Sequence, residues 1–404
     1  MLALAAASGL APSARGQAWY RQAFMGPANV GTFEKDTPKG AVRLGPVMVD
    51  LSAEAALEAT DNALLTPVGQ SGVQASAGLT FDANWNAAKE QRLKLTGEVV
   101  EIATLSGPVR SQKYLLLKPG SALRYTVYVK QVRIMPFINL AHEIDPIASP
   151  TASNTAVYDR SSYDGGLQVD FPLNHSFLQL IGSRGIQDVT TGTEPRSRDN
   201  RSSLGARAVR SFSAAVDAGV DLVHVVQDYV NGPSDSSTTE SASLFCSVTV
   251  TRSVKLRASA GYDWLVFSHP NLSGDVTRRS DPSASVEISH RVRRYLSYTV
   301  RLSRFLSDET LTSNFFRSEE VTVAPALILN ERTTLRLDAG WTRFAESVST
   351  GEQGTRRSFG TDLEYAAPGD YFLSLSFRDL NKGSSRPDMA YARRTLRLSV
   401  RKQF

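Results

Sequence analysis

The residues that could do chemistry in this chain are few and scattered. The five histidines are His142, His175, His224, His269 and His290, and none has a second ligand at the spacing of a zinc site. The single cysteine, Cys246, lies on the apolar side of an alternating stretch, where a thiol packs as a small hydrophobic group. His142-Glu143 lacks the second histidine of a metalloprotease motif. We therefore predict that the chain is not an enzyme and needs no cofactor or metal.

Charged residues on one side of the alternating stretches carry more information. Acidic members come early and basic members later, and the seven that we predict to line a lumen are Asp50, Glu54, Asp82, Arg257, Arg301, Arg336 and Arg397. Fixed charges of both signs inside a closed lumen would set up a field that acts on passing ions. Alternatively, the same charges pair with one another and fill a narrower barrel. Closure would pair the last strand with the first, so Arg397 and Arg401 are expected beside Asp50 and Glu54.

The elements that position these charges are stretches in which apolar and polar residues alternate. Between residues 47 and 60 the odd positions are apolar and the even positions mostly polar, which is the period of a strand with two different faces. Residues 73–85 and 254–266 repeat this pattern. Many such stretches run about fourteen residues, whereas strands of soluble sandwiches average about five or six. A tilted strand crosses a bilayer in about nine to eleven residues.

The connections between these stretches alternate in length. Residues 87–90 and 252–253 form tight turns, while residues 146–162 and 268–280 are long and polar. Short turns on one rim and long loops on the other are typical of outer-membrane barrels. The pattern predicts an all-β fold, a closed antiparallel transmembrane β-barrel of about eighteen strands, with sixteen as the alternative. Its short turns would be periplasmic and its longer loops extracellular. Within the sheet, Pro136 would remove a ladder hydrogen bond, which predicts a bulge there.

Composition excludes several classes of protein. The mean hydropathy is -0.21, and no run of about eighteen apolar residues occurs, so a helical membrane protein is excluded. A barrel is compatible with these values because its polar inner face offsets its apolar outer face. The net charge is +5 with both signs mixed along the chain. No basic stripe marks a nucleic-acid surface.

The two ends of the chain read as a targeting segment and an assembly signal. Residues 2–11 are apolar and rich in alanine, and Gly16-Gln17-Ala18 places small residues where a signal peptidase cuts. We predict a signal peptide over residues 1–18, a periplasmic lead-in or plug over 19–43, and the barrel over 44–404. The last stretch alternates from Leu396 onward and stops on Phe404.

A final amphipathic strand closed by a terminal Phe resembles the assembly signal of outer-membrane barrels. Together with Leu44-Gly45-Pro46, Asp61-Asn62 and residues 120–145, it makes the chain similar to the outer-membrane β-barrel porin families of Gram-negative bacteria. The resemblance implies the bacterial outer membrane as the location. It also implies outer-membrane lipid and the barrel assembly machinery as partners, and Phe404 as the signal that this machinery reads.

The function expected from this architecture is a channel for small polar solutes. The alternative is an envelope-assembly barrel that serves polysaccharide export or anchors a partner protein. The discriminating feature is the lumen, because a diffusion pore needs an open path whereas an anchor can be filled. Whether the barrel is a monomer or a homo-oligomer stays open from the sequence.

Overall fold

The computed structural model of the chain describes residues 42–65, 67–107, 113–145, 158–191, 197–230, 236–269, 276–307, 315–346 and 351–404. The predicted signal peptide lies outside the described residues. So does the predicted lead-in, apart from Val42 and Arg43, which begin the first strand.

Most of the described chain is β-strand. The strands are β1 (Val42–Leu44), β2 (Val47–Thr60), β3 (Gly72–Ala88), β4 (Gln91–Ser106), β5 (Lys113–Val129), β6 (Val132–Asp145), β7 (Tyr158–Leu173), β8 (Ser176–Thr191), β9 (Ser197–Ser213), β10 (Val216–Val230), β11 (Ser236–Thr251), β12 (Val254–Phe267), β13 (Arg278–Arg293), β14 (Leu296–Ser307), β15 (Phe316–Ile328), β16 (Thr333–Glu346), β17 (Gln353–Ala367), β18 (Tyr371–Ser384) and β19 (Tyr391–Gln403). A 3-10 helix, η1 (Pro387–Met389), precedes β19. Among the described residues, no helix has both the length and the apolar character needed to cross a membrane.

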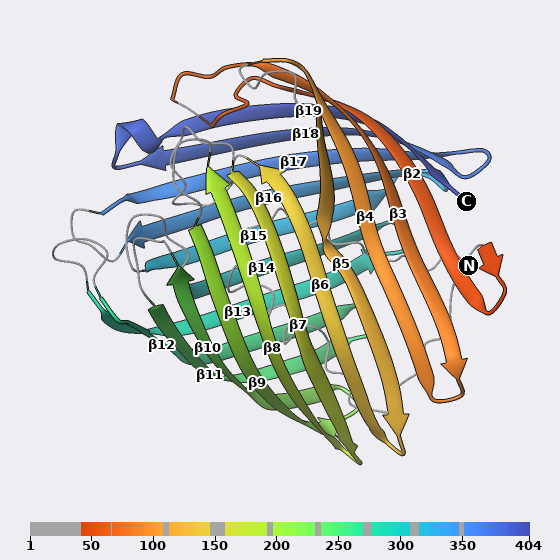
Figure 1. The fold of residues 1–404 in the computed structure, drawn as a ribbon, viewed down its shortest axis with the longest axis vertical. Helices are drawn as coiled ribbons and strands as arrows, with labels where there is room; N and C mark the ends of the chain where they lie inside the picture. The colour runs from red at the N-terminus through yellow and green to blue at the C-terminus, as the bar shows by residue number, and fades with distance from the viewer. Residues whose placement is uncertain are drawn as a thin grey trace.

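The strands form one closed wall (Figure 1). From β2 to β19 each strand pairs antiparallel with the next in the chain, and β19 then pairs with β2. The closing register runs from Thr395 opposite Thr60 to Gln403 opposite Ser52. Closure leaves no open sheet edge in the wall, which a strand structure inside a bilayer requires. The predicted eighteen-stranded barrel is confirmed, and the alternative of sixteen strands is wrong.

A short nineteenth strand completes the seam. β2 extends beyond the end of β19 at its first residues, and β1 pairs there, with Val42 opposite Val49 and Leu44 opposite Val47. The backbone N–H of Phe404 donates to the carbonyl of Leu51, 2.9 Å away. β1 and β19 therefore divide the same edge of β2 between them. Sequence reasoning did not find β1, because three residues are too few to show a period.

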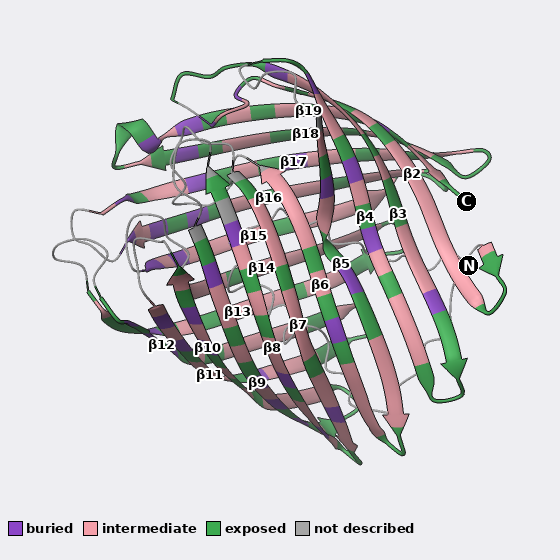
Figure 2. Cartoon of the chain, viewed as in Figure 1, coloured by how far each residue is buried: buried purple, intermediate pink, exposed green. Residues whose placement is uncertain are grey.

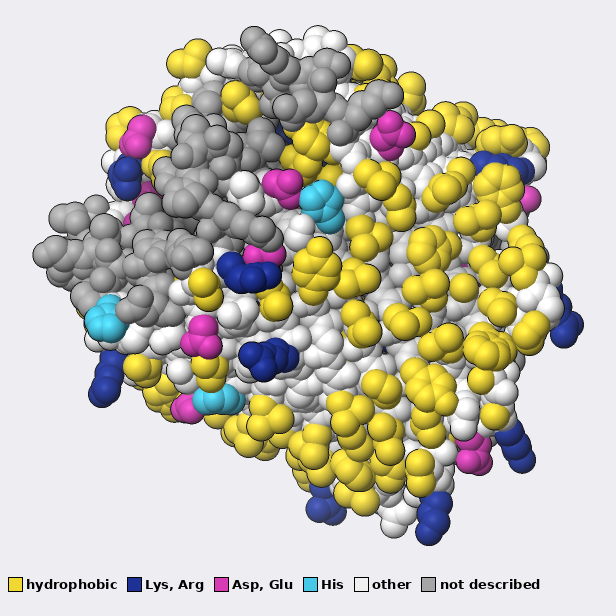
Figure 3. Space-filling view, viewed as in Figure 1, with side chains coloured by type: hydrophobic (Ala, Val, Ile, Leu, Met, Phe, Trp, Pro, Cys, Tyr) yellow, Lys and Arg dark blue, Asp and Glu magenta, His cyan; other side chains and the backbone are white. Residues whose placement is uncertain are grey.

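The outer surface is an apolar band. Leu396, Leu398 and Val400 of β19 are exposed, while Ser399 on the opposite face is buried. Figure 2 shows this alternation along many strands, and Figure 3 shows hydrophobic side chains covering the wall near the start of the chain. Exposed aromatic side chains lie toward both ends of the strands: Trp85, Tyr295, Tyr371 and Phe404 toward the short turns, and Tyr163, Trp264, Trp341 and Phe359 toward the long connections. Aromatic girdles of this kind flank the lipid-facing band of outer-membrane barrels.

The two rims differ as the sequence predicted. Every connection from an odd-numbered strand to the next is tight, such as residues 174–175 and 214–215, and every connection from an even-numbered strand is longer. β2 begins and β19 ends at the short-turn rim, so both ends of the described chain lie there (Figure 1). This is the periplasmic rim of the barrel, and the longer loops face outward from the cell.

The predicted bulge at Pro136 is wrong. β6 keeps one register with β7 through Pro136 opposite Leu167, and its pairing with β5 only pauses there and then resumes unchanged. The register shift lies in β5 instead, between Leu117 and Ser121. Gly120, between them, has a φ of 101°, which a glycine adopts readily and other residues rarely do. The missing donor of Pro136 is thus accommodated by a local gap in the ladder.

Candidate functional site in the barrel lumen

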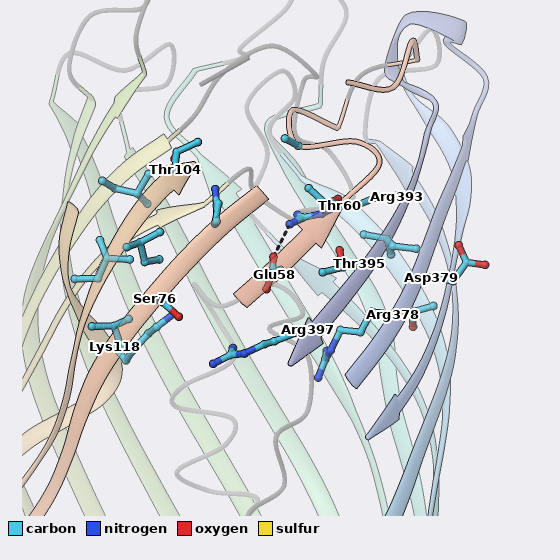
Figure 4. A pocket seen from close by; sticks show the side chains of 18 of the residues that line it. Glu58, Thr60, Ser76, Thr104, Lys118, Arg378, Asp379, Arg393, Thr395 and Arg397 are labelled. Atoms are coloured by element: carbon cyan, nitrogen blue, oxygen red, sulfur yellow. Dashed lines mark hydrogen bonds and ion pairs between the residues drawn. The ribbon is translucent and has the colours of Figure 1, made fainter. Parts of the chain in front are cut away.

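A cavity of about 400 Å³ lies inside the barrel between two groups of strands (Figure 4). One wall comes from β2 to β6 and the other from β16 to β19. The charged side chains along it are Glu58, Glu98, Lys118, Asp338, Arg356, Arg378, Arg393 and Arg397. Because β19 pairs with β2, the two groups are continuous through the seam and curve around one space.

Basic side chains reach the cavity from β17, β18 and β19. Arg393 is an ion-pair partner of Glu58, with Nη2 3.6 Å from Oε1, and its Nε–H donates to Thr60 Oγ1 at 3.3 Å. Arg378 and Arg397 point into the same space from neighbouring strands, while Asp379 points away from it (Figure 4). The strand period explains this difference, because consecutive residues of β18 face opposite sides of the wall.

Two of the cavity's cations have no acidic partner among the residues that the structure describes. They are Lys118, next to the register shift of β5, and Arg378 of β18. Charged side chains in a confined space are usually paired, so unpaired cations here are available to a solute. Apolar residues of the lining on β4 and β5 include Val100, Ile102, Tyr114 and Leu116.

Three of the predicted lumen residues, Glu54, Arg336 and Arg397, take part in ion pairs near the seam. Arg336 Nη2 lies 3.2 Å from Oε1 of Glu364, and Arg401 Nη2 lies 3.3 Å from the other oxygen of the same carboxylate. Arg397 contacts Glu54 across the seam. The expected neighbourhood of Arg397 and Arg401 is therefore partly found. Arg401 lies opposite Glu54 in the register, although its guanidinium contacts Glu364, and Asp50 lies beyond the residues of β2 that pair with β19.

The acids at the start of the barrel are arranged differently from the expectation. Asp50 lies opposite Asp82 of β3, away from the arginines of β19. Lys94 Nζ approaches Asp82 Oδ2 to 2.7 Å, and the side-chain amide of Asn84 donates to the other oxygen at 2.6 Å. The cation of Lys94, on β4 at the other side of β3, offsets the repulsion of acids that face one another.

The remaining predicted residues belong to a second group, on β9 to β14. Arg301 contacts Glu287 through Nε at 2.8 Å, and Arg257 lies opposite Glu287 in the register. Arg257 also lies 5.3 Å from the centre of the Phe245 ring. Arg257 and Arg301 thus converge on one carboxylate, in a part of the wall away from the seam. That the seven residues line a conduit stays a prediction, which conductance measurements can test.

A buried arginine of the second group was missed from the sequence. Arg207, 2% exposed, forms a bidentate pair with Asp221, with Nε to Oδ1 at 2.7 Å and Nη2 to Oδ2 at 2.9 Å. Its guanidinium lies 5.2 Å from the centre of the Phe245 ring. The ring lies over Gly219, where an added Cβ would be 2.6 Å from a ring carbon. The sequence shows on which face of its strand each of these residues lies. It does not show the cross-strand register that places them side by side.

A second buried pair lies at the long-loop end of β18. Lys382 and Glu352 are 0% and 1% exposed, with Nζ 2.8 Å from Oε1. Ser384 donates to the same oxygen at 2.6 Å, and the rings of Phe344 and Tyr391 flank the ammonium group. Such a pair is costly to break because it leaves a buried charge without its partner. It attaches the residue before β17 to β18 and so fixes the rim beside the cavity.

The described residues contain no group of three or more His, Cys, Asp or Glu side chains that could hold a metal ion. Cys246 is half-buried. The histidines near strand ends have other neighbours, such as Tyr298 Oη, 3.0 Å from His290 Nδ1.

Comparison with known proteins identifies the fold. No family model matches the chain, and no curated protein matches it in sequence. Among solved structures, Pseudomonas aeruginosa OpdK with vanillate is 12% identical, with a TM-score of 0.51 over 88% of this chain and 99% of that one. P. aeruginosa OpdL is 11% identical, with a TM-score of 0.50 over 89% and 99%. Acinetobacter baumannii OccAB3 is 9% identical, with a TM-score of 0.50 over 89% and 99%. At these identities the likeness concerns the fold. Closure, the apolar outer band and this shared architecture make the chain an outer-membrane β-barrel.

Proposed function

We propose that the barrel is a channel for small polar solutes and that its lumen cavity binds anions among them. The observation that carries the proposal is the set of basic side chains on the cavity wall, above all Lys118 and Arg378, which have no acidic partner in the described part of the chain. An anchor or a filled barrel has no need to keep cations unpaired around an internal space.

Fixed charges act strongly in such a space. Two unit charges 4 Å apart interact by about 1 kcal/mol in bulk water but by about 4 kcal/mol at the effective dielectric constant near a protein surface. Rings of charged side chains select ions in this way in pores. The acids Glu58 and Glu98 reduce the positive potential locally. Glu58 is already engaged by Arg393, so the cations without partners dominate beside it.

The apolar part of the lining supports organic anions as the solute class. Val100, Ile102 and Leu116 offer a surface to a carbon skeleton, while Arg378 and Lys118 offer charge to its acid group. Binding cavities commonly combine an apolar wall with a few placed polar groups. OpdK was solved with vanillate, a small aromatic carboxylate, so a barrel of this architecture can take such a solute.

Replacing Arg336 and Arg397 together by Gln should shift ion selectivity toward cations. The change removes two positive charges from the inner face and leaves Glu54 without its arginine. Reversal potentials across planar bilayers in a salt gradient measure the shift. It should shrink at about 1 M salt, where the screening length falls to about 3 Å. The control is the pair Arg184→Gln and Arg394→Gln on the outer wall, which should leave the reversal potential unchanged.

Replacing Lys118 and Arg378 by Gln separates a channel from a filled barrel. These two changes break no ion pair of the described residues, so the heat stability of the barrel should stay as in wild type while anion selectivity falls. Loss of stability without any change in selectivity would instead mean that the charges only support the wall. A folded wild-type barrel that carries no current would remove the channel and leave the second function, an envelope-assembly barrel for polysaccharide export or partner anchoring.

A further inference from the structure

Four arginines gather on the outer wall of β14 to β17, near the long-loop rim. They are Arg304, Arg317, Arg343 and Arg357, and we call them the outer arginine cluster. The cross-strand register connects them: Arg304 lies opposite Glu319, and Glu319 lies opposite Arg343. Arg357 lies opposite Trp341, which is two residues from Arg343 on the same face of β16. The cluster therefore covers four adjacent strands at one height.

These side chains are turned away from the lumen. Arg343 alternates with the buried residues Thr342 and Phe344, and Arg357 follows the buried Arg356. Arg343 and Arg357 are both exposed and share their face with the exposed rings of Trp341 and Phe359. The cluster is thus separate from the lumen cavity.

The positive charge of the cluster is largely uncompensated. Glu319 is its one acid, and it lies 3.9 Å from Arg304. Arg317, Arg343 and Arg357 have no acidic partner among the residues that the structure describes. The next acid along the wall is Asp379 of β18, which is 3.9 Å from Arg394. Elsewhere on this face at a similar height Arg198 is paired with Asp188 at 3.0 Å, so the arginines of β15 to β17 differ from it in lacking an acid in the described part of the chain.

The height of the cluster relative to the apolar band indicates its surroundings. Trp341 and Phe359 are 36% and 46% exposed and lie on the side of the cluster toward the short turns. Leu335 and Leu363 follow farther in that direction. Aromatic girdles lie at the boundary between hydrocarbon and head groups. The arginines just beyond the girdle, on the extracellular side, are therefore level with the head groups of the outer leaflet.

We infer that the outer arginine cluster binds the phosphate groups of a phosphorylated glycolipid in the outer leaflet. Guanidinium groups present parallel N–H donors that fit phosphate oxygens in pairs. Two adjacent exposed arginines, with two more beside them, match a head group that carries more than one phosphate. The acyl chains of the same lipid would then lie on Trp341, Phe359 and the apolar band below them. This site goes beyond the channel and does not depend on it.

The test measures lipid binding by the purified full-length barrel in a neutral detergent, using native mass spectrometry. The probes are bis-phosphorylated lipid A, lipid A without its phosphates, and phosphatidylglycerol. Wild type should bind the phosphorylated lipid A most tightly. Each arginine near an anionic lipid surface contributes about 1 kcal/mol, so the double variant Arg343→Gln with Arg357→Gln should bind it roughly 20- to 30-fold more weakly.

The matched control is Arg184→Gln with Arg210→Gln, which removes two exposed arginines from the outer wall of β8 and β9. It should change binding by less than about twofold if the site is local. Both variants should keep the heat-modifiable mobility of a folded barrel, because all four side chains are on the surface. Equal binding of lipid A with and without phosphates would overturn the inference. So would equal losses in the two variants, or binding of phosphatidylglycerol as tight as that of lipid A.

Discussion

Deletion of Phe404 should remove most of the folded protein from the outer membrane. Phe404 is the final residue of the seam in the sequence, and its backbone N–H donates to the carbonyl of Leu51. Its side chain is 49% exposed at the short-turn rim. There the ring is accessible to the assembly machinery that the resemblance to outer-membrane barrels implies. The unassembled chain should be found in the periplasm, sensitive to protease, in cell fractionation experiments.

The variant Phe404→Tyr is the control for this deletion. It keeps an aromatic ring and the backbone hydrogen bond at the same place, so it should assemble nearly as well as wild type. Normal membrane levels of the truncated chain would show that the seam and the assembly step do without the terminal ring. If Phe404→Tyr assembled as poorly as the deletion, assembly would require phenylalanine itself at this position, and an aromatic ring alone would not be enough.

The substitution Leu375→Arg should destabilise the barrel by about 2–4 kcal/mol. Leu375 is 45% exposed on the outer face of β18, between Leu363 and Leu398 of the neighbouring strands. A charge there must leave water for hydrocarbon, and the cost is greatest near the middle of the band. Unfolding by urea in phospholipid vesicles measures the loss.

The adjacent substitution Ser376→Arg is the matched control. Ser376 lies on the inner face, between Asp362 and Arg397 in the register. An arginine there has an acid beside it and polar surroundings, so the free energy of unfolding should change by less than about 1 kcal/mol. Equal losses from the two changes would mean that the faces of β18 are assigned the wrong way round.

The sequence predicted the architecture because a barrel repeats one local rule. The period of two assigns each side chain to a face, and the alternation of turn lengths assigns each rim. Both are visible within about fifteen residues, as along Val254–Phe267. The strand count followed from the same pattern. β1 and the register shift beside Gly120 could not be predicted, because they depend on how strands pair and the period of two does not show this.

The partners within the candidate site depend on register and closure, which are not local. Glu54 and Arg397 meet although 343 positions separate them in the chain. Sequence reasoning placed Arg397 near this acid by assuming closure, yet it could not show that Arg401 turns to Glu364. Glu352 lies between β16 and β17, and its burial arises from Lys382 and the rings around it. Lys118 was overlooked because it lies where the strand period is interrupted.

The closing register between β19 and β2 has a consequence for strand order. A ring of antiparallel neighbours has no first member, and both ends of the described chain lie at the same rim. A circular permutant that begins at β4 and ends at β3, with a linker from Phe404 to Val42, would keep every strand pair of the wall. Its equilibrium stability should therefore be close to that of the natural order. The order of the strands along the chain should therefore affect how the wall assembles in the membrane. It should have little effect on the stability of the wall once it is complete.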